Sequence, residues 1–417
     1  MNIAIIGAGI IGVTTAYELA SDGHQVTVFE RHGSVAEGSS FANAGVVAPG
    51  YVTPWAAPGM PGKVLRYLAA RHAPVRVRRP LAAADMAWMR QWLAACKPET
   101  YAANRARMQR LAFYSCRRLH DVAQRLEYDF DRSEGYMVLL RGEKERALVQ
   151  PGLAVLREAG VAFHEISAEE ARQIEPALHP ATPLAGAIHL PQDEVGNCRQ
   201  FAVILRDAAE QLGARFAFNT AVDRIDPASP ARLWIAGEPA PLAFDAVVMC
   251  AGVPSAELLR PLGIRLPLRP VYGYSVSAHI PEPVHAPRSG VMDERFKVSI
   301  TRLGQRVRVA GSAQIGGQPD AIAPRAVQTL YKVLDDWFPG AARRSGSVQV
   351  WKGARPMLPD GPPLIGASGV PGLWLNLGHG SSGWALSCGS ARVLSDLIVG
   401  RTPEIDTEGL GVERRRR

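Results

Sequence analysis

The first 30 residues constrain the fold of this chain more than any other stretch. Residues 2–7 (NIAIIG) form a short apolar run suited to a strand buried on both faces, and residues 13–23 (VTTAYELASDG) read as a helix that ends at a glycine. A second apolar run, residues 25–30 (QVTVFE), follows. Strand, helix and strand in this order form a βαβ unit whose two strands pair in parallel. The sequence therefore predicts an α/β fold that begins with a Rossmann-like unit.

Three glycines between the first strand and the helix have the GxGxxG spacing of a dinucleotide-binding turn. Gly7 permits the tight turn, Gly9 lets a diphosphate approach the backbone, and Gly12 lets the helix pack closely on the strand. The helix N-terminus then faces the phosphates. Glu30, eighteen residues after Gly12 and at the end of the second strand, is placed to accept hydrogen bonds from a ribose. Together these features predict dinucleotide binding.

The order of the following segments favours FAD over NAD. Nicotinamide dehydrogenases usually continue with further βα units in regular succession, whereas here a loop rich in Gly, Ser and Ala (residues 31–55) precedes helical segments to about residue 128 and the strand-like GYMVLLR (135–141). A strand that ends in Ala-Gly (244–252) and a glycine turn at a helix start (GHGSSG, 378–383) offer further close approaches of backbone to ligand. A nucleotide site assembled from both ends of the chain suits an FAD enzyme.

The charge pattern does not favour nucleic acid as a partner. The net charge is +8, but the basic residues are almost all arginine and are scattered along the chain. The densest basic run, KVLRYLAARHAPVRVRRP at residues 63–80, has two readings. It is either an ordinary solvated helix and turn, or a surface that docks to an anionic membrane or a redox partner.

Cysteine spacing and hydropathy predict a cytoplasmic location. The five cysteines stand far apart, without a CxxC pair, which argues for a reducing compartment and against a metal site. The N-terminus lacks the charged region and cleavage site of a signal peptide, and no apolar run reaches the length of a bilayer span. Peripheral association with the inner membrane stays open.

One arginine stands in a stiff stretch near the C-terminus. Residues 351–366 (WKGARPMLPDGPPLIG) contain four prolines and three glycines, a composition that predicts a rigid loop. Pro356 narrows the conformations open to the preceding Arg355. The loop is either a structural turn, with Arg355 paired to an internal acid such as Asp360, or half of a binding site.

A set of longer motifs resembles a known family over nearly the whole chain and in the same order. The motifs are GAGIIG with FER, SSFANAGVVAPGYVTPWAAPG, LPQDEVGNC, GYS, ITRLGQRVRVAG, GARPMLPDGPPLIG and LNLGHGSSGW. They resemble the bacterial D-amino acid dehydrogenases, flavoproteins of the larger group that includes D-amino acid oxidase and glycine oxidase. GxGxxG marks only the superfamily, whereas ANAGxxxPGY, GxRPxxPDGxPxIG and LNxGHGxxGW are specific.

The resemblance implies FAD-dependent oxidative deamination of D-amino acids similar to D-alanine, giving 2-oxo acids and ammonia. A hydride would pass from the substrate Cα to flavin N5, and the electrons would pass to a quinone or another acceptor. Two other readings stay open. One is an oxidase or dehydrogenase of glycine, sarcosine, D-proline or hydroxyproline on the same fold, and the other is a non-catalytic flavin-binding subunit.

The resemblance also implies a two-lobed α/β architecture, with a discontinuous Rossmann-like FAD-binding domain and an antiparallel-sheet substrate domain. Strands of the substrate sheet are expected at residues 135–141, 265–280 and 295–312. The expected ranges are 1–60, 195–265 and 345–400 for the FAD-binding domain, 61–194 and 266–344 for the substrate or cap domain, and 401–417 for a basic C-terminal tail.

The same resemblance assigns the site residues. Arg355 would hold the substrate carboxylate, because a guanidinium fork meets a carboxylate in two parallel hydrogen bonds, and Tyr274 and Tyr272 would line the substrate side. Tyr272 stands where the family commonly has a basic residue. FAD is expected to bind non-covalently, since the VWKGARP stretch has no cysteine for a thioether. The expected FAD contacts are Gly7, Gly9, Ile10, Ile11, Gly12, Glu30, Arg31, Ser39, Ser40, Asn43, Ala44, Gly45, Val222, Ala251, Gly252, Gly378, His379, Gly380, Ser381, Ser382 and Gly383.

Overall fold

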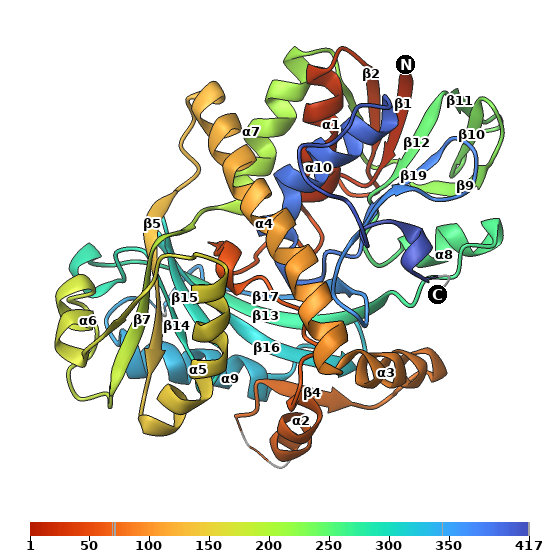
Figure 1. The fold of residues 1–417 in the computed structure, drawn as a ribbon. Coiled ribbons are helices and arrows are strands. Elements are labelled where there is room, and N and C mark those ends of the chain that lie inside the picture. Colours follow the sequence, from red (N-terminus) through yellow and green to blue (C-terminus); the bar gives the residue numbers. More distant parts are fainter. Residues whose placement is uncertain (69, 71, 344, 416–417) are drawn as a thin grey trace.

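The computed structural model describes residues 1–68, 70, 72–343 and 345–415 and has two lobes, each built around its own large β-sheet (Figure 1). One lobe contains the sheet that the N-terminal motif begins, and the other contains a larger, mainly antiparallel sheet. The α/β class expected from the sequence, with a Rossmann-like lobe and an antiparallel-sheet lobe, is confirmed.

The first lobe has a six-stranded sheet in the order β18-β19-β12-β1-β2-β8, in which every neighbouring pair is parallel except β18 with β19. As predicted, β1 is buried on both faces: Ile3 and Ile5 pack toward helices, whereas Ala4 and Ile6 pack toward a small three-stranded antiparallel sheet. The strands are β1 (Asn2–Ile6), β2 (Gln25–Phe29), β8 (Arg215–Ala217), β12 (Ala246–Met249), β18 (Leu364–Ala367) and β19 (Leu373–Leu377), and in the small sheet β9 (Val222–Asp226), β10 (Ala231–Ile235) and β11 (Leu242–Phe244).

The second lobe has a ten-stranded sheet whose main path runs β17-β13-β16-β15-β14-β5-β7-β3. Most neighbours are antiparallel, but β14 pairs with β5, and β16 with β4, in parallel. Strands appear at all three expected ranges, and the last of them holds the hairpin β15–β16. The strands are β3 (Val46–Val47), β4 (Val75–Arg78), β5 (Ser133–Leu140), β6 (His164–Ile166), β7 (Gly186–Val195), β13 (Arg269–His279), β14 (Gly290–Asp293), β15 (Val298–Leu303), β16 (Arg306–Gly316) and β17 (Gln349–Met357).

The helices cover the two sheets. Helices α1, α4, α7 and α10 share one hydrophobic core with the six-stranded sheet, and α9 closes a second core on one face of the ten-stranded sheet (Figure 1). The α-helices are α1 (Ile10–Ser21), α2 (Met60–Leu68), α3 (Ala83–Ala95), α4 (Pro98–Leu126), α5 (Glu143–Glu158), α6 (Ala168–Ile174), α7 (Cys198–Gln211), α8 (Ser255–Leu259), α9 (Pro324–Trp337) and α10 (Gly383–Ile398). Short 3-10 turns are η1 (Pro49–Tyr51), η2 (Arg260–Leu262), η3 (Pro283–His285), η4 (Gly380–Ser382) and η5 (Val412–Arg415).

The lobe boundaries differ from the expected ranges at three places. Helix α4 lies in the range expected for the cap, but its apolar side chains, Leu111 among them, belong to the core under the six-stranded sheet. Strands β3 and β17 lie in ranges expected for the FAD-binding domain, but both pair within the ten-stranded sheet. In each case the element belongs to the lobe with which it pairs or packs, and its partners are distant in the sequence.

The stretch around Arg355 is a strand rather than the predicted rigid loop. Strand β17 pairs with β13 along its length, with Arg355 opposite Val271. β17 is an edge strand of the sheet. A proline such as Pro356 is tolerated there, because an edge strand does not need every backbone N–H for pairing with a neighbouring strand. The extended conformation that Pro356 imposes on Arg355 is the conformation of a strand.

The described part of the expected basic C-terminal tail, residues 401–415, packs on the first lobe. Leu410 is fully buried, and its carbonyl accepts a hydrogen bond from the Ile365 amide at 2.8 Å. Arg414 forms an ion pair with Asp360 at 3.2 Å. Residues 416 and 417 lie outside the described residues.

The basic stretch 63–80 forms the end of α2 and strand β4, and its residues 69 and 71 lie outside the described residues. Among the described helices, none combines the length and the apolar character needed to cross a bilayer.

The docking of the C-terminal segment is testable through Leu410. We expect Leu410→Ala to lower the free energy of unfolding by about 2–4 kcal/mol, because a fully buried leucine leaves a cavity when truncated. The matched control is Leu242→Ala, because the Leu242 side chain is 45% exposed. This variant should change the free energy of unfolding by less than about 0.5 kcal/mol. Urea unfolding of the purified protein measures both, and equal small effects would show that residues 401–415 do not pack as described.

Candidate active site

Four of the predicted cofactor-binding segments meet at one edge of the six-stranded sheet. Gly7, Glu30, Ala251 and Gly378 follow within two residues of the carboxyl ends of β1, β2, β12 and β19, which are parallel to one another. Nucleotides bind in open α/β sheets outside this edge. The topology therefore brings segments from both ends of the chain together at this edge of the sheet.

The glycine turn after β1 leaves room for a diphosphate. Gly7 has φ +102°, and a Cβ there would lie 2.8 Å from the Cys250 carbonyl oxygen. A Cβ on Gly12 would overlap the Gly7 carbonyl oxygen, so both glycines are required by the protein itself. A Cβ on Gly9 would meet only Ser40 Oγ, at an ordinary 3.7 Å. Contacts within the protein therefore do not require a glycine at position 9, and the open space there suits a ligand that approaches the backbone.

The start of helix α1 presents polar groups to the same space. The Ile10 amide donates to Ser40 Oγ at 3.1 Å, and no side chain caps the helix at Gly9. First-turn amides, here including Ile11, have no partner within the helix and are suited to phosphate oxygens. Ser40 is buried, whereas Ser39 is exposed.

Glu30 is held in place by backbone amides. Its Oε2 accepts from the Ala8 amide at 2.7 Å and its Oε1 from the His32 amide at 2.9 Å. Each carboxylate oxygen can accept a second bond, so the ribose role expected of Glu30 fits its geometry. The Thr220 amide donates to the Glu30 carbonyl at 2.8 Å, which places the start of β9 at Val222 beside the same strand end. Arg31 is exposed.

The backbone of residues 42–44 is attached to the ten-stranded sheet through three consecutive carbonyl groups. The donors are Ser275 Oγ to Ala42 at 2.8 Å, Arg308 Nη1 to Asn43 at 3.2 Å and Thr301 Oγ1 to Ala44 at 3.0 Å. The Asn43 side chain accepts from the Gly45 amide at 2.9 Å and rigidifies the turn. Sequence reasoning did not select the three donors, although the GYS and ITRLGQRVRVAG motifs contain them.

Arg308 is a buried cation that makes no direct contact with a carboxylate of the described residues. Its side chain donates to Ser277 Oγ at 2.9 Å and to the Asn43 carbonyl, and no carboxylate of the described residues contacts it. Burial lowers the pKa of Arg308 to about 10, so it is protonated at neutral pH. A buried charge is costly unless polar groups compensate it, which makes this region favourable for an electron-rich ligand.

The C-terminal glycine turn completes the edge. Residues 378–383 pass through η4 directly into the long helix α10, whose N-terminus is the positive end of its dipole. His379 is 2% exposed, its Nε2 is bonded to Ser390 Oγ at 2.9 Å, and burial lowers its pKa to about 3. The imidazole is therefore neutral, and its Nε2 is engaged within α10.

Arg355 lies flat against strand β13. A Cβ on Gly273 would overlap its guanidinium group, so the glycine makes room for it. Nη1 donates to the Ser312 carbonyl at 3.0 Å, and the guanidinium carbon lies 5.8 Å from the Trp55 ring centroid. Trp55 Nε1 in turn donates to Ser381 Oγ at 3.1 Å, which connects Arg355 to the C-terminal glycine turn. Trp55 was not selected from the sequence, although it stands in the family motif.

Arg355 has no acidic partner among the described residues, and Asp360, the acid considered for it, is paired with Arg414 instead. Arg355 keeps some accessible surface, while the surrounding protein lowers its pKa to about 10 through desolvation. It is thus a desolvated, protonated guanidinium with unused donors. The structural-turn reading, with an internal ion pair to Asp360, is wrong.

Tyr272 and Tyr274 lie on the other face of the sheet from Arg355. Because Arg355 pairs with Val271 and side chains alternate along a strand, the two even-numbered tyrosines point away from it. Tyr274 is 1% exposed, packs in the core under α9 and donates to Gln314 Oε1 at 2.8 Å. The ammonium group of Lys352 lies over Tyr272, with Nζ 4.1 Å from the centroid of the tyrosine ring. The expectation that they line the substrate side of Arg355 is corrected.

The open space at Gly9 gives a direct test of the cofactor site. We expect Gly9→Ala to leave the melting temperature of the cofactor-free protein unchanged but to weaken FAD binding at least tenfold, about 1.4 kcal/mol, because the methyl group occupies the diphosphate space. Fluorescence titration with FAD measures the affinity. Gly152→Ala, where a Cβ meets nothing within 4 Å, is the control and should bind FAD normally. Unchanged FAD affinity in Gly9→Ala would remove this turn from the site.

The chain matches known flavoproteins over its length. Residues 2–397 match the family model described as DAO, FAD dependent oxidoreductase. The chain is 44% identical over 416 residues to a D-amino acid dehydrogenase of Cereibacter sphaeroides, covering 99% of this chain and 95% of that protein, and 42% identical over 417 residues to one of Rhizorhabdus wittichii, covering 99% and 100%. The fold is similar to the crystal structure of glycine oxidase from Geobacillus kaustophilus, with a TM-score of 0.77, 23% identity and coverage of 99% and 98%. This chain therefore belongs to the DAO family of FAD-dependent oxidoreductases.

Proposed function

We propose that this chain is a D-amino acid dehydrogenase that deaminates D-alanine-like substrates to 2-oxo acids and ammonia. Arg355 is the single observation that carries the proposal. It is a protonated guanidinium, desolvated by the protein, bonded only to the Ser312 carbonyl among described groups, and connected through Trp55 to the FAD site. The names of the full-length relatives support the same activity.

The substrate carboxylate is the group that Arg355 recognises. Nη1 is fixed by the Ser312 carbonyl, which sets the plane of the guanidinium and leaves Nη2 free to donate. Two parallel N–H···O bonds to a carboxylate are favoured in this geometry. Holding the guanidinium against Gly273 before substrate arrives reduces the ordering cost of binding.

Bound FAD supplies the two-electron sink for oxidation at the substrate Cα, and the resulting imino acid hydrolyses in water. The described side chains provide positioning more than proton transfer. His379 is neutral and bonded within α10, and Tyr272 and Tyr274 lie across the sheet, so none of them is placed as a general base. The substrate amine must therefore reach the site in its neutral form, and fixing the carboxylate at Arg355 contributes to catalysis through orientation.

Anaerobic titration of the purified protein tests the function. We expect D-alanine to bleach the visible flavin band and L-alanine to leave it unchanged. Arg355→Ala should still bind FAD but should need a much higher concentration of D-alanine. Truncating one partner of a buried charge pair costs about 2–5 kcal/mol, which corresponds to a decrease in kcat/KM from roughly 30-fold to more than 1000-fold.

The control variant is Arg224→Ala, whose side chain is more than half exposed and should titrate like the parent. Bleaching by D-alanine that is equally efficient in Arg355→Ala would remove Arg355 from substrate binding while keeping the reaction. A flavin band that neither isomer bleaches would contradict the proposed substrate class.

We also propose that the electrons pass to a quinone or another acceptor rather than to oxygen, and that the protein acts in the cytoplasm at the inner membrane surface. The basic stretch 63–80, as far as it is described, supports contact with an anionic surface. With D-alanine we expect a water-soluble quinone to sustain turnover with little oxygen consumption. Oxygen uptake equal to product formed would instead assign the chain as an oxidase.

A further inference from the structure

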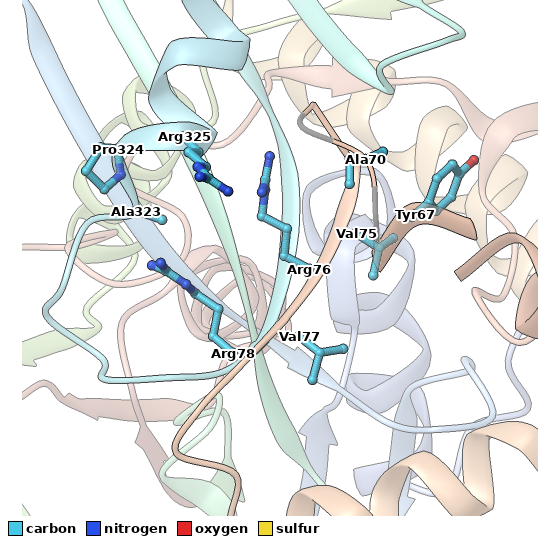
Figure 2. A pocket seen from close by; sticks show the side chains of 10 residues that line it. Tyr67, Ala70, Val75, Arg76, Val77, Arg78, Ala323, Pro324 and Arg325 are labelled. Atoms are coloured by element: carbon cyan, nitrogen blue, oxygen red, sulfur yellow. The ribbon is translucent and has the colours of Figure 1, made fainter. Parts of the chain in front are cut away.

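A second cluster of arginines lies on the ten-stranded lobe. Arg76 and Arg78 come from β4, and Arg325 is the second residue of α9. All three line one pocket of about 550 Å³, and Figure 2 shows their guanidinium groups turned toward the same space. Two segments about 250 residues apart in the sequence thus bring three positive charges together.

The cluster lies on the opposite face of the sheet from Arg355. Arg76 pairs with Gln314 of β16, and Gln314 accepts the hydroxyl of Tyr274, which packs under α9. Directly paired residues share a face of the sheet, so Arg76 and Arg78 face α9 and Arg325. The sheet therefore separates this pocket from the substrate and FAD sites.

Two of the three arginines have unused guanidinium groups. Among the described residues that line the pocket none is acidic, and in the described part of the chain the guanidinium groups of Arg78 and Arg325 make no hydrogen bond or ion pair. Burial lowers the pKa of Arg76, and the neighbouring charges of Arg325 and Arg78 lower it further. Three guanidinium groups that repel one another are stabilised together when an anion binds between them.

The lining selects for an anion with more than one charge. Apart from the arginines, the pocket is lined by small apolar side chains and by Tyr67, so recognition rests on the guanidinium groups and the positive end of α9. A single carboxylate would leave most of the charge unpaired. A phosphate monoester or a diphosphate carries two or three charges, and its oxygens match the planar forks of arginine.

We propose that Arg76, Arg78 and Arg325 form a binding site for a phosphoryl anion, a phosphate monoester or diphosphate, on the face of the substrate sheet opposite Arg355. The phosphoryl group belongs either to a soluble phosphate compound or to the headgroup of an anionic lipid. The site does not depend on the deamination proposed above, since no group of the pocket takes part in it.

Calorimetric titration of the FAD-loaded protein with inorganic pyrophosphate tests the site. We expect saturable binding that weakens at least tenfold in the triple variant Arg76→Gln, Arg78→Gln and Arg325→Gln. The charge-matched control replaces Arg66, Arg79 and Arg224 with Gln, three exposed arginines that do not line the pocket, and should bind within twofold of the parent. An unchanged flavin spectrum and melting temperature verify the fold of each variant. Absence of saturable binding to the parent, or equal loss in both triple variants, would overturn the proposal.

Arg355→Ala separates this site from the substrate site, because it should leave pyrophosphate binding unchanged. Loss of pyrophosphate binding in Arg355→Ala would place the anion at the substrate site and overturn the proposal.

Sedimentation with phosphatidylcholine vesicles that contain phosphatidic acid or phosphatidylserine identifies the source of the phosphoryl group. Retention by phosphatidic acid vesicles alone, competed by pyrophosphate and lost in the pocket variant, would identify a lipid headgroup. Pyrophosphate binding without vesicle retention would identify a soluble phosphate. Equal retention by both vesicles that pyrophosphate does not compete would show only diffuse attraction and would contradict a defined site.

Discussion

Three hydrogen bonds to the carbonyl groups of residues 42–44 connect the first lobe with the ten-stranded sheet. Side chains of Ser275, Arg308 and Thr301, from three adjacent strands of the ten-stranded sheet, donate to a segment that leaves the six-stranded sheet. A loop of small residues has little apolar surface to fix it, so these polar contacts determine its path. Because the protein engages three consecutive carbonyl groups of the segment, these bonds fix the loop against the ten-stranded sheet.

The alternation of side chains across β13 and β17 divides the chemistry of the sheet between its faces. One face carries Arg355 and the serines of β13, with Gly273 leaving room for the guanidinium. The other carries Tyr272 and Tyr274 and the core under α9. Arg308 and Arg355 both face the first lobe without a carboxylate among the described residues, so this face attracts carbonyl and carboxylate groups. A one-residue shift of register would exchange the two faces and bury Arg355 in an apolar core.

The sequence predicted best what is encoded locally. The βαβ unit and the glycine turn were correct because glycine spacing and apolar runs determine them over 30 residues. Arg355 was selected through the resemblance, but the loop predicted around it was wrong, since a Pro- and Gly-rich stretch reads as a loop unless a partner strand is known. The tyrosines were misplaced because their face depends on the pairing of β13 with β17, about 80 residues later. Arg308 was missed for the same reason: one of the two arginines in RVRV becomes notable only when its burial, without direct contact to a carboxylate of the described residues, is known.

Strand β16 connects these features through one irregularity. Its pairing with β13 shifts between Tyr272 and Tyr274, so that three steps along β16, from Gly311 to Gln314, oppose two along β13. Within this bulge Ser312 has φ +58°, a conformation rare for a residue with a side chain, and its carbonyl accepts Arg355. A bulge changes the direction in which backbone groups point, and a regular strand would place that carbonyl in the ladder instead. The bulge that positions Arg355 also begins the segment of β16 that pairs with β4, so the proposed substrate site and the arginine pocket on the opposite face are supported by the same distortion of one strand.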